Sequence, residues 1–276
     1  SQGVSSAASD VYKRQIIFSI GLVITVGFGI AGYVEGKKQL KKADNPIHYT
    51  KDYKHEDAKI KNLKINTDTS NVIIKKGDHF HVKGEGGIKG KTKINSTIKG
   101  DTLAVESKLP NPTINFTFGN ITNSTITITV PERQLSDVTI YNDTGDMTIE
   151  GLKANHLEAQ LDTGELVLKA ADLNKVDLTS DTGDIEIMQT LFKNMRIGND
   201  TGDTEVKGIK GDVNLQVQSD TGDIEVDYAE PPKNTKVIHK EDVDMDIHQP
   251  ALKAKRYGNA SHTIELESDT GTVEIN

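Results

Sequence analysis

The chain has 276 residues and a formal net charge of −8, with 34% hydrophobic residues, 5% aromatic residues and 24 glycines. It contains no Cys and no Trp, which excludes a disulfide framework, a thiolate metal site and a cysteine nucleophile. Residues 1–134 carry 20 Lys and Arg against 12 Asp and Glu, whereas residues 135–276 carry 13 against 29. Such an acidic half argues against a nucleic-acid partner, because phosphate binding needs a basic surface.

The first apolar segment covers residues 16–34, which are 19 positions without a charge. About 20 apolar residues cross a hydrocarbon core of about 30 Å, so this segment predicts a transmembrane helix or signal-anchor. The alternative is a cleaved signal peptide, with residues 29–31 as the cleavage region. Residues 1–15 form an N-terminal flank that resembles a sequence-assembly artefact rather than a targeting element.

Lys and Arg flank the apolar segment on both sides, and their count favours a cytoplasmic C-terminal side. Large domains, however, translocate largely regardless of charge. We therefore expect a single-pass protein of the cell membrane with an extracellular repeat domain. Residues 35–58 are polar and Lys-rich, which predicts a charged, solvated stalk before a repeat domain at 59–276.

A repeated tripeptide, Asp-Thr-Gly, dominates the second half of the chain, with successive spacings of 19, 19, 19, 20 and 49 residues. Apolar residues alternate with polar ones on both sides of each copy, which predicts two short, half-buried strands joined at a corner. Glycine supplies a positive φ there, and the aspartate can accept a hydrogen bond from the backbone N–H two residues on. The structural turn residues are Asp143, Gly145, Asp162, Gly164, Asp181, Gly183, Asp200, Gly202, Asp220, Gly222, Asp269 and Gly271.

Degenerate copies of the repeat lie at residues 63–74 and 241–247. Repeats of this length cannot bury an apolar face alone, but stacked copies share one narrow core. With no helical periodicity for a crossover, the pattern predicts an all-β parallel β-solenoid of about 19-residue repeats, similar to a single-stranded β-helix. This architecture is favoured over a sandwich or a barrel.

Small polar residues precede most corners on the core side of the strand, and Leu161 interrupts them. Stacked in register, they would form a hydrogen-bonded ladder along one corner. These residues are Asn142, Ser180, Asn199, Ser219 and Ser268.

Asp-Thr-Gly is also the signature of aspartic proteases, in which two carboxylates share a proton. Six copies at fixed spacing cannot all converge on one site, so the sequence predicts a structural role and no enzyme. No other catalytic set and no cofactor site is recognised. His79 and His81 lie on a predicted strand and are expected to form an exposed pair.

Acidic residues recur three and five positions after the motif aspartate in three consecutive repeats. Stacking would align them in a strip whose mutual repulsion raises their pKa values. One interpretation is a solvated face, and the other is a landing surface for calcium, magnesium or a cationic partner. The strip residues are Asp184, Glu186, Asp203, Glu205, Asp223 and Glu225.

The strand at 125–130, the segment 135–140 and the repeated Gly-Asp-hydrophobic units resemble the putative-adhesin family of Gram-positive bacteria, over residues 59–276. The resemblance implies a β-strand-repeat domain of the cell envelope, often with an N-terminal membrane anchor and without catalytic residues. We expect a non-enzymatic adhesion or scaffold module that binds a cationic peptide, an envelope polymer or a membrane protein. The alternative is an envelope-stress sensor that binds cationic peptides and signals through a membrane partner.

Overall fold

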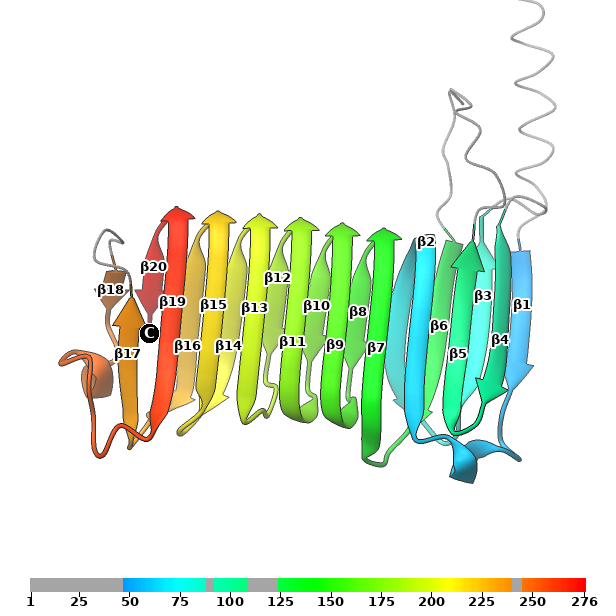
Figure 1. The fold of residues 1–276 in the computed structure, drawn as a ribbon, viewed down its shortest axis with the longest axis horizontal. Coiled ribbons are helices and arrows are strands. Elements are labelled where there is room, and N and C mark those ends of the chain that lie inside the picture. The colour runs from blue at the N-terminus through cyan, green and yellow to red at the C-terminus, as the bar shows by residue number, and fades with distance from the viewer. Residues whose placement is uncertain (1–46, 88–91, 109–123, 240–244) are drawn as a thin grey trace, which may run out of the picture.

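The structure is a computed structural model that describes residues 47–87, 92–108, 124–239 and 245–276. These residues form 20 β-strands and two short 3-10 helices, η1 (Asp57–Lys59) and η2 (Pro250–Leu252). The strands lie in two sheets, here called sheet A and sheet B, which face each other across one narrow core (Figure 1). The parallel β-solenoid is therefore confirmed as the architecture.

Five rungs of the solenoid stack in chain order, and each contributes one strand to each sheet. Within each sheet these strands pair in parallel and in register. The strands of sheet B are β7 (Leu135–Thr144), β9 (Lys153–Thr163), β11 (Asp172–Thr182), β13 (Asn194–Thr201) and β15 (Asn214–Thr221). The strands of sheet A are β8 (Met147–Glu150), β10 (Leu166–Lys169), β12 (Ile185–Met188), β14 (Thr204–Lys210) and β16 (Ile224–Glu230).

The core follows the predicted period-two alternation. In the third of these rungs, Val176 and Leu178 of sheet B and Ile185 and Ile187 of sheet A are at most 2% exposed. Each buried aliphatic side chain stabilises the fold by about 1.5–3 kcal/mol. Because a rung buries only a few such residues, its stability depends on the rungs on either side.

The N-terminal end has a different strand order. A 16-residue strand, β2 (Asn62–Gly77), passes through both sheets and pairs with β7 and β8 on one side. On its other side lie β5 (Thr102–Lys108) in sheet B and β6 (Ser124–Pro131) in sheet A, which come later in the chain. Three antiparallel strands complete this end: β1 (Ile47–Asp52), β3 (His81–Gly86) and β4 (Lys93–Lys99).

The C-terminal end repeats this exchange. The outermost rung consists of β17 (Thr235–His239) and β18 (Met245–Ile247). The last strands of the chain, β19 (His262–Thr270) and β20 (Val273–Ile275), lie between that rung and the rung of β15 and β16. The degenerate copy at 63–74 and the described residues 245–247 of the other copy thus belong to rungs of the solenoid, but neither rung stacks in simple chain order.

The N-terminal third contains the predicted stalk and the predicted membrane segment. The predicted stalk at 35–58 is wrong from residue 47 onward, because β1 pairs with β3 and Tyr53 is buried in the core. The charged residues of β1 are exposed, so the sequence did not reveal a strand whose Tyr49, like Tyr53 just after it, packs against the core. The predicted membrane segment at 16–34 lies outside the described residues. The described part of the chain has no helix with the length and apolar character that a membrane crossing needs.

Candidate functional site

Each regular rung passes from sheet B to sheet A at a glycine corner, and the corners stack directly on one another. The six corner glycines have φ values between +123° and +153°. The Gly183 N–H donates to the Thr201 carbonyl of the next rung at 2.8 Å. A Cβ atom on Gly183 would lie 1.9 Å from the carbonyl oxygen of Gly164. Glycine is therefore required at this corner, as predicted, for two reasons: the positive φ and the close contact with the neighbouring rung.

The hydrogen bond predicted within the tripeptide is wrong for five of the six copies, because the glycine N–H donates to a threonine carbonyl of the next rung instead. These glycines are Gly145, Gly164, Gly183, Gly202 and Gly222. The motif aspartates still align, since the residues on either side of them pair in register. Partial burial, and then the charges of Asp162 and Asp68, raise the pKa of Asp143. We call this line the corner row: Asp68, Asp143, Asp162, Asp181, Asp200, Asp220 and Asp269.

The small polar residues before the corners are all buried, as predicted. Asn142, Asn199 and Ser268 bond to corner carbonyls, whereas the buried hydroxyl groups of Ser180 and Ser219 have no hydrogen-bond partner in the described part of the chain. Asn199 Nδ2 donates to the carbonyl oxygens of Gly202 at 3.0 Å and Gly183 at 3.1 Å, and Asn142 makes the equivalent pair. Leu161 is fully buried and interrupts the series. The predicted continuous ladder is therefore wrong, and three of the five side chains instead cap backbone carbonyls at the turns.

The predicted acidic strip divides into two rows with different roles. Asp184 Oδ1 accepts the N–H of Asp203, and Asp203 Oδ1 accepts the N–H of Asp223, both at 2.9 Å. Asp223 Oδ1 accepts the N–H of Thr272 at 2.7 Å and its hydroxyl at 2.9 Å. These three aspartates therefore bind neighbouring corners.

The expected increase in pKa along the strip is wrong for Asp223. The backbone N–H of Thr272, and then its hydroxyl, lower the pKa of this carboxyl group. Hydrogen bonds donated to a carboxylate stabilise its charged form, and this effect exceeds the repulsion that we expected from stacking.

The glutamates of the strip do stack, and the row is longer than predicted. Glu186, Glu205 and Glu225 are in register across β12, β14 and β16. Glu274 of β20 and Asp246 of β18 continue the line, and we call these five residues the Glu row. Neighbouring strands are about 4.8 Å apart, so the carboxylates repel one another.

Lys207, two residues after Glu205 on β14, partly compensates the negative charge of the Glu row. Lys207 Nζ lies 2.6 Å from Glu205 Oε2 and 3.5 Å from Glu225 Oε2. The Glu205 hydrogen bond and charge, followed by the Glu225 charge, raise the pKa of Lys207. Asn276 Nδ2 donates to Glu225 Oε1 at 3.2 Å. The compensation therefore lies in the middle of the row.

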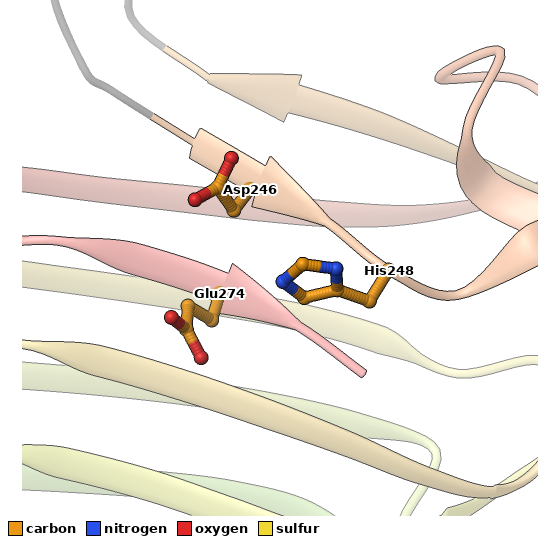
Figure 2. A group of neighbouring side chains, drawn as sticks. All are labelled: Asp246, His248 and Glu274. Atoms are coloured by element: carbon orange, nitrogen blue, oxygen red, sulfur yellow. The ribbon is translucent and has the colours of Figure 1, made fainter.

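The C-terminal end of the Glu row has a different composition (Figure 2). Asp246, His248 and Glu274 place one donor atom each within 4.8 Å of one another. Asp246 and His248 are exposed, and Glu274 is partly buried. None of these three side chains has a hydrogen bond or ion pair with another residue of the described ranges.

The outer face of sheet B carries mixed charges instead. His156 Nε2 lies 2.9 Å from Asp177 Oδ2, which also contacts Lys175. A shallow depression on this face includes Lys175, Asp177, Arg196 and Glu265. Long acidic rows are thus a property of the corner edge and of sheet A, where Lys207 alone among the described Lys and Arg residues pairs with the Glu row.

The histidine pair of the N-terminal end differs from the prediction. His79 Nε2 lies 2.9 Å from Asp52 Oδ2, and His81 Nε2 lies 2.8 Å from Thr50 Oγ1. Both partners belong to β1, far from the histidines in sequence. The carboxylate was missed because this segment was expected to be a stalk.

Comparison with known proteins agrees with this two-sheet repeat. The sequence model of the Toastrack DUF4097 family matches residues 60–258. The chain belongs to this family. No significant match is found among curated proteins.

Solved structures similar to this Toastrack domain have low sequence identity to it. A crystal structure named as a putative adhesin from Bacteroides fragilis has 15% identity and a TM-score of 0.50, covering 85% of this chain and 99% of that chain. One named as a putative cell adhesion protein from Clostridium sporogenes has 15% identity and a TM-score of 0.36, covering 84% and 99%. The predicted resemblance to adhesins is confirmed, but its restriction to Gram-positive bacteria is not shown, since Bacteroides is Gram-negative.

Within this Toastrack domain, the repeat pattern located the corner residues and three members of the Glu row. Glu274, Asp246 and His248 were missed. Spacing along the chain could not reveal that Glu274 lies beside Glu225, because another rung separates them in sequence. Alternation around the degenerate copy at 241–247 was the one available signal for Asp246.

Proposed function

We propose that this protein is a non-enzymatic, envelope-anchored module that binds a cationic peptide or polymer along its acidic flank. The flank consists of the corner row and the Glu row. The observation that carries the proposal is the register of Glu186, Glu205, Glu225, Glu274 and Asp246 on one face.

The physical argument is charge density. Carboxylates about 4.8 Å apart lie well within the screening length of about 8 Å at physiological salt, so the rows act as one field. Lys207 is the one Lys or Arg that forms an ion pair with this row among the described residues. A cationic chain laid across the rungs would relieve the remaining repulsion and gain favourable charge pairs.

The apolar segment at 16–34 supports anchoring to a membrane, with the repeat domain outside the cell. The solenoid would then present the acidic flank to the envelope. The name of the similar structure from Bacteroides fragilis, a putative adhesin, is consistent with a binding role. The linear arrangement of the motif aspartates favours a structural rather than a catalytic role.

The test is the binding of oligolysine to the full chain in a mild detergent, measured by fluorescence anisotropy. We expect Glu186→Gln, Glu205→Gln and Glu225→Gln combined to weaken binding by about tenfold, or about 1.4 kcal/mol. The matched control removes three charges from sheet B instead, with Glu106→Gln, Glu158→Gln and Glu265→Gln.

The control variant should bind within about twofold of the original chain, since net charge alone contributes a long-range and screened effect. Equal weakening in both variants would show that net charge, not the Glu row, determines binding. An absence of oligolysine binding at physiological salt would overturn the proposal.

A further inference from the structure

We propose that Asp246, His248 and Glu274 bind a single divalent transition-metal ion of the zinc class. The site lies at the C-terminal end of the Glu row, on the exposed face of sheet A (Figure 2). It does not depend on the proposed partner of the acidic flank. It offers one imidazole nitrogen and two carboxylate oxygens, a donor set that suits zinc.

The geometry brings the donors close to ligand distance. One donor atom from each residue lies within 4.8 Å of the others. Two donors about 2.1 Å from one ion are at most about 4.2 Å apart, so small rotations of the side chains would complete the site. The three residues are not fully buried, which leaves room for these rotations.

The backbone places the donors on one face. Asp246 and Glu274 are directly opposite each other in the parallel register of β18 and β20. His248 is two residues after Asp246, so extended chain directs it to the same side. The N–H of His248 donates to the Ile275 carbonyl at 2.7 Å, and that of Gln249 donates to the same oxygen at 3.0 Å. These bonds extend the pairing to His248.

Electrostatics separates this end from the rest of the Glu row. Among the described residues, Lys207 forms ion pairs with Glu205 and Glu225 but not with Glu274. In the described part of the chain, no Lys or Arg forms an ion pair with Asp246 or Glu274. Two adjacent carboxylates therefore face a histidine without a compensating cation. A bound divalent ion would supply that charge.

The imidazole distinguishes the expected metal from calcium and magnesium. Those ions prefer oxygen ligands, six to eight for calcium, whereas imidazole suits zinc, copper and nickel. Three protein donors would leave the fourth tetrahedral position of zinc for solvent or a donor from another molecule.

The test is a titration of the full chain in a mild detergent, after chelator treatment, with zinc chloride by calorimetry. Cobalt(II) serves as a visible-absorption probe of the same site. Loss of an outer-shell partner typically weakens metal binding by about 10–100-fold. We expect His248→Ala, which removes a ligand itself, to weaken zinc binding by more than this. The matched control is His262→Ala, at the start of β19 in sheet B, which should retain zinc binding.

Two results would overturn the proposal: an unchanged zinc affinity in His248→Ala, or equal affinities for zinc and calcium in the original chain. The second result would indicate an acidic surface without a nitrogen ligand. Because His248→Ala leaves all carboxylates in place, oligolysine binding should persist in it. Loss of zinc binding with retained oligolysine binding would therefore separate this site from the proposed function.

Discussion

The middle of the solenoid and its two ends differ in how their strands are ordered. Between residues 135 and 230, rungs follow the chain, and each strand pairs with the strand one repeat away. At both ends, the strands next in sequence lie farther out, and a rung more distant in sequence is inserted between them and the regular stack. The regular rungs need only a repeated corner, whereas an end must also protect the unpaired edges of two sheets.

The ends protect their edges by different means. At the N-terminal end, Tyr49 Oη of β1 accepts the Ser96 N–H at 2.9 Å, and Lys51 Nζ donates to the Ser96 carbonyl at 2.7 Å. At the C-terminal end, a loop covers the edge of β17: the Val237 N–H donates to the Lys255 carbonyl, and the Tyr257 N–H donates to the Thr235 carbonyl. The repeat residues thus form the stacked rungs, and residues outside the repeat pattern cover the sheet edges at its two ends.

The largest predicted effect concerns the stacked corner. Gly183→Ala combines a φ of +136° with a Cβ atom 1.9 Å from the Gly164 carbonyl oxygen, so the two rungs must separate. We expect the free energy of unfolding to fall by more than about 3 kcal/mol in urea denaturation.

The control for this corner is Gly211→Ala, where φ is also positive, at +70°, but no atom lies within 4 Å of the added Cβ. It should cost only about 1–2 kcal/mol, from the backbone conformation alone. Equal losses in the two variants would show that stacking does not constrain the corner.

An intermediate effect is expected at the N-terminal end. Tyr49→Phe removes the acceptor of the Ser96 N–H and a 2.6 Å hydrogen bond to the Ser96 hydroxyl. We expect a loss of about 1–2 kcal/mol in the same denaturation experiment. Tyr257→Phe is the control, since that side chain is 48% exposed, and it should change stability by less than about 0.5 kcal/mol. If Tyr49→Phe lowered the free energy of unfolding no more than the control does, edge protection by this tyrosine would be contradicted.

The smallest effect is the pH dependence from Asp223. Its pKa is lowered in the folded protein by the Thr272 N–H and hydroxyl, so its contribution is present above the unfolded pKa of about 3.9. That contribution is lost as the pH falls through the lower folded pKa. We therefore expect the melting temperature of Asp223→Asn to fall less than that of the original chain as the pH is lowered below 4.

The control is Asp181→Asn in the corner row, whose carboxylate has no hydrogen bond with another residue of the described ranges. It should follow the acid unfolding of the original chain. The same acid response in Asp223→Asn and the original chain would mean that the Thr272 bonds contribute nothing to the pH dependence.

The sequence contained enough to predict the rungs, because period-two alternation and the corner glycines are local properties. It also placed Glu186, Glu205 and Glu225 on one face. The interleaved ends could not be predicted, since a spacing of 49 residues does not say on which side the intervening rung stacks. The role of Asp184 was missed because a side chain beside a corner can turn toward the neighbouring backbone instead of solvent.

The last rung of the chain lies inside the stack, so that Glu274, not Asp246, is the neighbour of Glu225. The chain has no cysteine, so an introduced pair can be tested by disulfide formation and peptide mapping. Adjacent strands place Cα atoms about 5 Å apart, within disulfide range, whereas two strand spacings exceed the limit of about 7 Å. We expect Glu225→Cys with Glu274→Cys to cross-link, and Glu225→Cys with Asp246→Cys to remain reduced. Efficient cross-linking of the second pair and not the first would contradict the account.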